Sequence, residues 1–250
     1  MSDLRVLIAA GCPHATVTQY RCVHLKEQFE AAGARVDLRD WTDSAALDGE
    51  QPLPYDVLVL QRVAMSAPLR RLIERVRGAG GRVLFDTDDL VFEPELAHWH
   101  RGVANLPAGE QAIYVDGVRR YRTTLDAADA VLAASPLLAE LAGRHGMPAF
   151  VHRNALGTEM MALATQLYNQ RATRPGNGPV VIGYGSGTAT HDVDFDQAVP
   201  ALVDIMTDYP EVELWIAGPL ALPPSLSSFG TRVRRFPLLD WRRWFELLAQ

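Results

Sequence analysis

The sequence predicts an α/β protein of two domains, each built on a parallel sheet and the second one incomplete. Short β-branched runs alternate with longer amphipathic runs, which is typical of βαβ units. The segment RATRPGNGPV interrupts this alternation with prolines and glycines, and a new strand-like run follows it. We therefore expect an N-terminal domain over 1–168, a linker over 169–179 and a partial C-terminal domain over 180–250.

The first domain is expected to alternate strands with helices along its whole length. Three of the expected helices end at a glycine that can serve as C-cap: Gly33, Gly78 and Gly146. Apolar positions in the helices recur every three or four residues, as Leu69, Leu72 and Val76 do. The expected strands are 5–10, 35–39, 56–60, 82–85, 130–133 and 149–152, and the expected helices are 17–32, 67–77, 110–127 and 137–145.

The second domain starts the alternation again but has fewer elements. We expect strands at 180–184, 213–217 and 232–236 and helices at 192–208 and 241–249. A typical sheet has about five or six strands. Because the sequence stops at Gln250, inside or just after a helix, we expect a second sheet that is unfinished.

The composition is that of an ordinary folded protein, with 48% hydrophobic and 22% charged residues. A formal charge of −6 gives no general attraction to nucleic acid, so no nucleic-acid partner is expected. Two cysteines, Cys12 and Cys22, and the lack of room for a signal peptide before the first strand indicate a cytoplasmic protein. The most apolar stretch, 127–142, is too short and too interrupted to span a bilayer, so any membrane contact is expected to be peripheral.

A glycine-rich turn from Gly183 to Asp192 follows the first strand of the second domain and precedes a helix. Backbone N–H groups and a helix N-terminus at such a turn favour a diphosphate. The same letters also suit a plain tight turn in which Thr190 or Asp192 caps the helix.

Three carboxylates, Asp86, Asp88 and Asp89, follow a buried-looking strand of the first domain. Ligands of parallel α/β sheets bind beyond the carboxyl ends of the strands, so this placement favours a functional site. Facing carboxylates suit proton handling or the binding of sugar hydroxyls. The alternative is that Asp88 or Asp89 caps the next turn while the others are solvated.

The loop after the first strand and the helix that follows it should border the same edge. Gly11, His14, Tyr20 and Arg21 lie there, although a loop histidine is more often solvated. Cys12 is more often a small buried residue than a nucleophile. No metal site is expected, since His98 and His100 have no convincing third ligand nearby.

Several segments together resemble glycosyltransferase family 4 (group 1), a family of retaining sugar transferases with two Rossmann-like domains, the GT-B type. The likeness runs along the whole chain, with no single segment decisive. The segments are Gln19-Tyr20-Arg21, 55–62 (YDVLVLQR), 86–92 (DTDDLVF), 133–137 (AASPL), 152–156 (HRNAL), 182–188 (IGYGSGT) and 214–220 (LWIAGPL).

The resemblance implies transfer of a sugar from a nucleoside-diphosphate sugar to a hydroxyl acceptor, such as a glycan or a lipid-linked sugar, with retention and without cofactor or metal. On this view the candidate catalytic residues are Asp86, Asp88 and Asp89. Phe236, Pro237 and Leu238 would present backbone to the base. The implied donor-binding residues are Gly183, Gly185, Ser186, Gly187, Thr188, His191, Gly218 and Pro219, and the acceptor-side residues are Gly11, His14, Tyr20, Arg21 and Asn154.

Three departures separate this chain from the family pattern. Ser186 and His191 stand where the family has arginine and lysine, and Gly157 stands where it has aspartate. The family's glutamate pair would lie beyond Gln250, so we expect a fragment with little activity. Two alternatives remain: Asp86-Thr87-Asp88 as the Asp-x-Asp metal motif of a GT-A-like transferase, and a non-catalytic remnant that binds sugar or nucleotide.

Overall fold

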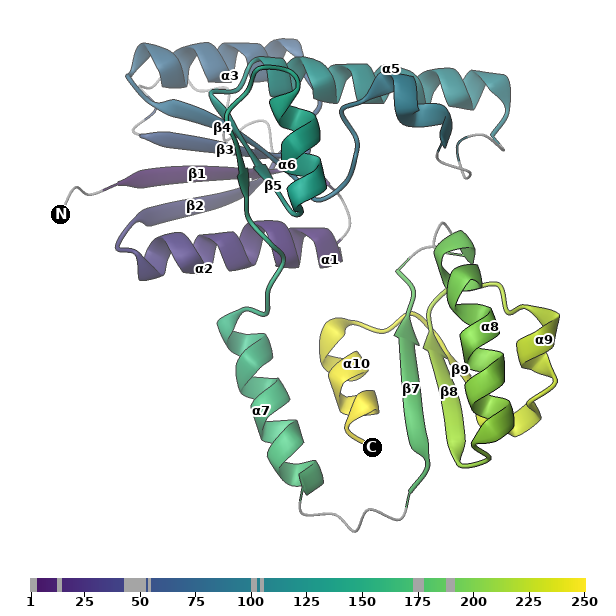
Figure 1. Ribbon diagram of the computed structural model, residues 1–250. Coiled ribbons are helices and arrows are strands. Elements are labelled where there is room, and N and C mark those ends of the chain that lie inside the picture. Colours follow the sequence, from purple (N-terminus) through teal and green to yellow (C-terminus); the bar gives the residue numbers. More distant parts are fainter. Residues whose placement is uncertain are drawn as a thin grey trace. The chain divides into compact units, whose positions relative to one another are not determined.

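A computed structural model of the chain describes residues 4–12, 15–42, 53, 55–99, 103, 106–172, 178–187 and 192–250. The chain divides into two compact units, Met1–Thr158 and Glu159–Gln250. Each unit has its own parallel sheet with helices packed against it (Figure 1). The expected pair of α/β domains is therefore present.

The first unit is built on a six-stranded parallel sheet with the order β2-β1-β3-β4-β5-β6. Each expected strand is confirmed, with ends that shift by at most two residues. The chain passes from β2 across β1 to β3, so the direction in which the sheet grows reverses at the β1–β3 pair. Such a switch point is where open α/β sheets bind ligands. The strands are β1 (Arg5–Ala10), β2 (Arg35–Asp40), β3 (Val57–Gln61), β4 (Arg82–Thr87), β5 (Ala130–Ala133) and β6 (Ala149–Val151).

Helices cover both faces of this sheet (Figure 1). Leu72, Leu125 and Leu138 fill the core on one face, and Cys22 and Leu25 fill the core on the other. Because side chains alternate along a strand, β1 contributes to both cores. The first face carries α3 (Ala67–Gly78), α5 (Ala108–Asp126) and α6 (Pro136–Gly143); the second carries α1 (Ala15–Val17), η1 (Thr18–Val23) and α2 (His24–Ala31).

The helix after β1 is interrupted by a π-helical segment. It runs on from α1 through η1 to α2, where the sequence predicts one regular helix over 17–32. A π-helical turn inserts an extra residue into the ladder of hydrogen bonds and is frequent at functional sites. In this chain the segment turns Arg21 and Cys22 into the interior. A short 3-10 helix, η3 (Pro94–Trp99), was not predicted from the sequence.

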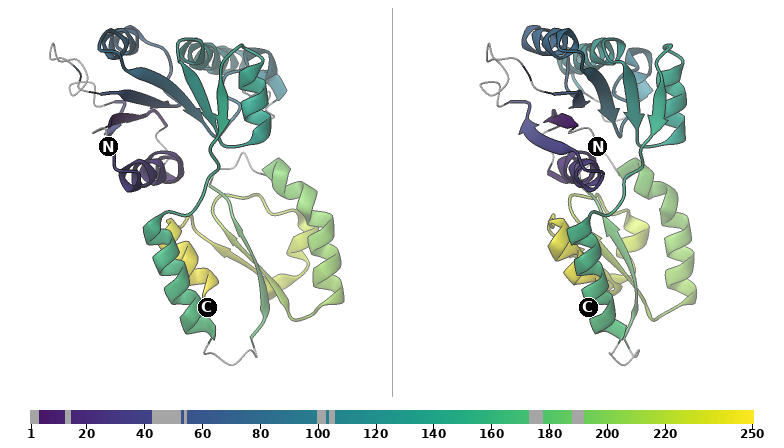
Figure 2. Two further views of the ribbon diagram at one scale, coloured as in Figure 1. Left: turned by 60° about the vertical axis from the view of Figure 1, so that its left-hand side comes forward. Right: turned by 90° about the vertical axis from the view of Figure 1, so that its left-hand side faces the viewer.

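The second unit has a three-stranded parallel sheet with the order β7-β8-β9. Phe195, Leu202 and Leu226 pack on one of its faces, and Trp244 and Leu248 lie on the other. Figure 2 shows helices on both faces of this sheet. The first face carries α8 (Asp192–Asp208) and α9 (Pro224–Ser227), and the second carries α10 (Trp241–Leu248). The strands are β7 (Val180–Gly185), β8 (Val212–Ala217) and β9 (Val233–Phe236).

The division between the units comes earlier than the linker predicted at 169–179. The reason is α7 (Thr158–Ala172), a helix that the sequence does not predict and that packs with α10 inside the second unit. Arg171 donates a hydrogen bond to the carbonyl of Leu248 at 3.0 Å, and Arg242 forms an ion pair with Glu159. The predicted N-terminal domain, 1–168, therefore includes most of a helix that belongs to the second unit.

Candidate functional site

Polar groups of the first unit converge at the carboxyl ends of β1, β3 and β4, beside the switch point. The loop after β1 lies close to the end of β3, where the N–H of Gly11 donates to the carbonyl of Gln61 at 2.8 Å. A Cβ on Gly11 would lie 2.5 Å from the carbonyl oxygen of Arg62. Glycine is therefore required at position 11 for packing, and a ligand contact by Gly11 remains a prediction.

Arg62 also lies at this edge and is not among the site residues predicted from the sequence. Its backbone is left-handed, with a φ of 48°, which is uncommon for a residue with a side chain. Its N–H donates to the carbonyl of Asp86 at 3.0 Å. Its Nη1 lies 2.8 Å from Oδ2 of Asp89 and 3.4 Å from Oδ1 of Asp88. Strained backbone of this kind persists where the surroundings enforce it, and it is concentrated at functional sites.

Asp88 and Asp89 therefore share one guanidinium. The side chain of Asp88 is 15% exposed and that of Asp89 is 63% exposed. Burial lowers the pKa of Arg62, but the carboxylates of Asp89 and Asp88 raise it above its ordinary value, so the guanidinium stays charged. The cluster of Arg62, Asp88 and Asp89, which we call the edge cluster, carries a formal charge of −1.

Two other groups beside the edge cluster were not predicted. Burial raises the pKa of Tyr114, on α5, and its charged neighbours are Arg62 and Asp89. Gln61, the last residue of β3, is fully buried, and neither atom of its amide has a hydrogen-bond partner within the described residues. Buried amides are nearly always hydrogen-bonded, so Gln61 is an exception at this edge of the sheet.

Asp86 does not join the edge cluster, although the sequence places it with Asp88 and Asp89. It is fully buried and forms two hydrogen bonds with Arg21, from Nε to Oδ1 at 3.0 Å and from Nη2 to Oδ2 at 2.5 Å. Burial raises the pKa of Asp86 to about 6, while the hydrogen bonds and charge of Arg21 oppose that rise. Arg21 is equally buried, so both side chains are enclosed within the first unit, and their contact with a substrate remains a prediction.

This pairing also bears on the Asp-x-Asp alternative. Both carboxylate oxygens of Asp86 accept hydrogen bonds from Arg21, while Asp88 lies against Arg62. A metal held between Asp86 and Asp88 would have to displace a buried bidentate arginine, which is unfavourable. The described residues contain no group of three or more His, Cys, Asp or Glu side chains that could hold a metal ion.

The remaining residues predicted on the acceptor side are Tyr20, Asn154 and His14. Tyr20 packs edge-to-face on His24, with ring centroids 5.3 Å apart. Asn154 is exposed, and its Oδ1 accepts a hydrogen bond from Nη1 of Arg21 at 3.1 Å. His14 lies outside the described residues.

In the second unit, Gly183 and Gly185 lie within β7 rather than in the turn after it. A Cβ on Gly183 would lie 2.6 Å from Cδ2 of Leu248, and one on Gly185 would lie 3.5 Å from Cε2 of Trp244. Gly183 therefore makes room for α10, whereas a Cβ at Gly185 would make only ordinary van der Waals contact with it. Their role in binding phosphate is not supported by their position.

The predicted turn begins instead at Ser186, just after the carboxyl end of β7 and beside the carboxyl end of β8. Ser186 is buried and its N–H donates to the carbonyl of Ala217 at 2.8 Å. Gly218 has a φ of 99°, and a Cβ there would lie 1.9 Å from the carbonyl oxygen of Ser186. Gly187 has open space around it and Pro219 is exposed, so these two remain accessible to a donor. Thr188 and His191 lie outside the described residues.

Charged side chains of both signs lie near this turn, and none of them is among the predicted donor-binding residues. The first turn of α8 carries Asp192 and Asp194, and Oδ1 of Asp192 accepts a hydrogen bond from the N–H of Ala221 at 3.2 Å. Two carboxylates at a helix N-terminus oppose the binding of a diphosphate there. Arg235 on β9 supplies a cation nearby, because its Nη2 donates to the carbonyl of Leu220 at 2.6 Å.

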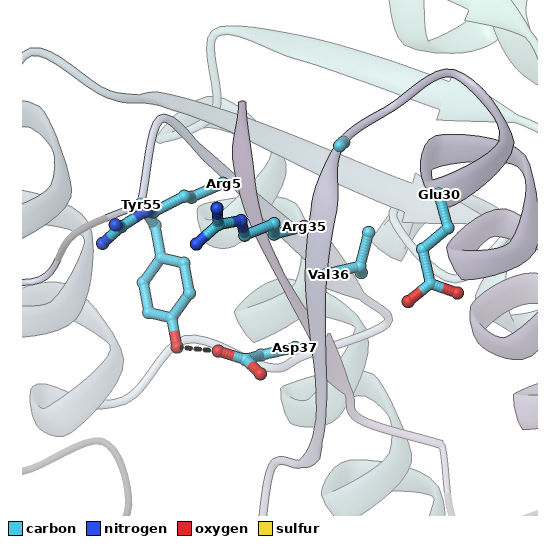
Figure 3. A pocket seen from close by; sticks show the side chains of 7 residues that line it. Arg5, Glu30, Arg35, Val36, Asp37 and Tyr55 are labelled. Atoms are coloured by element: carbon cyan, nitrogen blue, oxygen red, sulfur yellow. Dashed lines mark hydrogen bonds between the residues drawn. The ribbon is translucent and has the colours of Figure 1, made fainter. Parts of the chain in front are cut away.

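A separate hollow of about 530 Å³ lies at the opposite, amino-terminal end of β1 and β2 (Figure 3). Tyr55 donates a hydrogen bond to Asp37 there at 2.6 Å. Burial, and then Asp37, raises the pKa of Tyr55 to about 12, so it keeps its proton. Arg5 and Arg35 stand side by side at the starts of their strands, away from the edge where such sheets bind ligands.

No protein-family model matches the chain, and no curated protein matches it. Solved structures do match over nearly its whole length. An alpha-glucosyltransferase in complex with UDP and a 13-mer DNA is 12% identical, with a TM-score of 0.55 over 99% of this chain and 70% of that one. A glycosyltransferase from Rickettsia africae is 10% identical, with a TM-score of 0.52 over 100% of this chain and 71% of that one.

A UDP-GlcNAc 2-epimerase from Neisseria meningitidis, bound to UDP-GlcNAc, is also similar: 11% identical, with a TM-score of 0.50 over 98% of this chain and 75% of that one. At these identities the likeness concerns the fold. It confirms the predicted class, α/β with two Rossmann-like domains of the GT-B type.

Proposed function

We propose that this chain is a glycosyltransferase that takes a sugar from a nucleoside-diphosphate donor and passes it to a hydroxyl acceptor. The observation that carries the proposal is the edge cluster: Arg62, Asp88 and Asp89 at the carboxyl ends of β3 and β4, next to the switch point. The fold supports it, because a protein named as an alpha-glucosyltransferase, in complex with UDP, and one named as a glycosyltransferase share that fold. The sequence motifs favour family 4 and a retaining reaction.

The edge cluster suits a neutral acceptor. Asp88 and Asp89 offer carboxylate oxygens to sugar hydroxyls, and Arg62 holds both carboxylates in place. Tyr114 adds a partly buried aromatic ring close by. Because the cluster carries a formal charge of −1, it should bind an uncharged sugar or glycan better than a phosphorylated one.

The donor side is proposed at the ends of β7 and β8. Gly187 and Pro219 are accessible there, and the exposed side chain of Leu238 lies beside Gly218. The carboxylates of Asp192 and Asp194 disfavour a diphosphate at the start of α8, so Arg235 is the cation that we propose for it. This arrangement favours weak donor binding.

We propose no cofactor and no metal, and a glycan or lipid-linked sugar as acceptor rather than nucleic acid. A cytoplasmic location remains a proposal, which the free, buried thiols of Cys12 and Cys22 support. Any membrane contact is proposed to be peripheral. Within the described ranges, no helix combines the length and the apolarity needed to cross a bilayer.

The test is to incubate the purified chain with UDP-glucose and UDP-GlcNAc, with and without neutral glycan acceptors, and to follow UDP release. NMR of the product identifies its anomeric configuration and detects any epimer of the sugar nucleotide. We expect slow, acceptor-dependent UDP release with retention, because donor binding is expected to be weak. Asp88→Asn should slow transfer at least about tenfold, because it weakens a charge-assisted hydrogen bond.

Asp37→Asn is the matched control, since Asp37 lies in the same unit but at the opposite edge of the sheet. It should leave transfer unchanged. Formation of an epimer without transfer would assign the chain to the other chemistry found on this fold. Binding of UDP without turnover would make the chain a nucleotide-binding protein, and wild-type transfer by Asp88→Asn would remove the edge cluster from the mechanism.

A further inference from the structure

Residues 152–158 connect β6 to the end of the first unit and have no regular structure before Thr158. We call this segment the strap. It lies along the helix formed by η1 and α2, and contacts it through Arg21, His24, Glu27 and Gln28. Arg21, Glu27 and Gln28 each lie three or four positions from His24, so these residues fall on one face of the helix. None of these contacts depends on a ligand.

Arg21 holds the start of the strap from inside the first unit. Its Nη1 donates to the carbonyl of His152 at 2.5 Å and to Oδ1 of Asn154 at 3.1 Å. The rest of its guanidinium is fixed by Asp86 at the end of β4. A guanidinium donates in a rigid, planar fork, so the position of Asp86 determines where the strap carbonyl can lie. Gln28 adds a second contact at this end, since its Oε1 lies 3.0 Å from Nε2 of His152.

Glu27 holds the other end of the strap. Its Oε2 accepts hydrogen bonds from the N–H of Thr158 at 2.8 Å and from the hydroxyl of Thr158 at 3.0 Å. Thr158 begins α7, and the first N–H groups of a helix have no partner within it. A carboxylate from the first unit therefore satisfies the end of the strap where the second unit starts.

Between these ends, the strap backbone passes directly over His24. A Cβ on Gly157 would lie 2.3 Å from Cδ2 and 2.6 Å from Nε2 of the His24 ring. The ring cannot easily move away, because His24 is buried and packs against Tyr20. The glycine at position 157 is thus explained by close packing of the strap on the helix.

We infer that Arg21 and Glu27 are positioning residues that latch the strap onto the first unit along its whole length. The strap then moves with the first unit up to Thr158, the last latched residue. The inference does not rest on the proposed function, and its test needs neither substrate nor turnover.

The test is hydrogen exchange followed by mass spectrometry on the full chain. Glu27→Ala removes both acceptors of Thr158, and we expect peptides covering 152–158 to exchange about tenfold faster. Gly157→Ala should raise exchange in the same peptides by pushing the strap off His24. Peptides from β1, β4 and β8 should keep their wild-type rates in both variants.

Two variants serve as controls. Glu27→Gln keeps an oxygen acceptor and should retain most of the protection. Glu30→Ala lies on the same helix but pairs with Lys26, and it should not change exchange in the strap. The inference is overturned if Glu27→Ala and Gly157→Ala both leave strap exchange within about twofold of wild type. It is also overturned if Glu30→Ala speeds strap exchange as much, or if the whole first unit exchanges faster with the strap.

Discussion

Replacing Asp86 with alanine should destabilise the first unit by about 3–5 kcal/mol. The change leaves the buried guanidinium of Arg21 with only the His152 carbonyl and the Asn154 side chain as acceptors. An uncompensated buried charge is among the most costly defects in a protein interior. For a unit of this size the melting temperature should fall by about 6–20 °C.

The ion pair itself should contribute far less than this figure suggests. Burial raises the pKa of Asp86 to about 6 in spite of Arg21, so the cost of removing the carboxylate from water exceeds the gain from pairing. Replacing both partners by apolar residues, as in Arg21→Met with Asp86→Leu, should therefore cost less than Asp86→Ala alone. A cycle of Arg21→Met, Asp86→Leu and the double variant measures the coupling of the two charges.

The assay is urea denaturation of the full chain, followed by hydrogen exchange. Peptides from β1 and β4 then report on the first unit, and peptides from β8 report on the second. Asp126→Ala is the control, because Asp126 forms a surface pair with Arg122 on α5 at 2.8 Å and should cost less than about 0.5 kcal/mol. If Asp86→Ala costs as little as this control, Asp86 does not hold a buried charge.

Three further changes test other parts of the structure. Gly218→Ala puts a Cβ 1.9 Å from the Ser186 carbonyl in a backbone with a φ of 99°. It should cost the second unit at least about 2 kcal/mol in thermal denaturation, whereas Gly187→Ala should be tolerated; equal melting temperatures would refute this. Burial, and then Arg21, lowers the pKa of His152 below its ordinary value of 6.5. The charged ring is therefore disfavoured in the folded chain. Strap protection factors should be full above about pH 6.5 and should fall as the pH drops through the folded pKa of His152, in wild type but not in His152→Asn. Arg235→Ala should weaken UDP binding about tenfold in isothermal titration without changing the melting temperature, while Arg234→Ala should have no effect; equal affinities would remove Arg235 from the donor site.

The strands could be predicted because their signal is local. A run such as Val57–Gln61 is apolar at nearly every position, which is typical of a parallel strand buried on both faces. The helix α7 has no comparable signal. Polar and apolar residues are mixed around its axis, and Met161 and Tyr168 are largely exposed, so the sequence shows little helical periodicity there.

The edge of the first sheet was predictable, but the roles of its residues were not. The position of Asp86, Asp88 and Asp89 after a strand indicates the edge. Whether each carboxylate faces solvent or an arginine depends on partners from other elements, Arg21 in η1 and Arg62 after β3. Gly11 is the one local clue to this edge in the sequence. The π-helical distortion at Arg21 and the left-handed backbone of Arg62 follow from packing and leave no mark in the sequence.

The glycines of the second unit also show that the role of a residue depends on elements far away in the sequence. Gly183 and Gly187 look alike in the sequence, as members of one glycine-rich segment. Gly183 lacks a side chain because Trp244 and Leu248 occupy the space, and Gly187 has nothing around it. Because α10 lies about sixty residues later in the chain, a local motif cannot distinguish a packing glycine from a ligand-binding one.

The strap also decides where the protein can be cut into pieces. A fragment ending at Val151, after the last strand of the first sheet, would look complete by its secondary structure. It would, however, lack the carbonyl of His152 and the side chain of Asn154, and so deprive the buried Arg21 of two acceptors, while Glu27 would lose Thr158. A fragment extended through Thr158 keeps every one of these bonds. The natural end of the first folding unit therefore lies seven residues beyond its sheet, in a stretch that has no secondary structure of its own until its last residue.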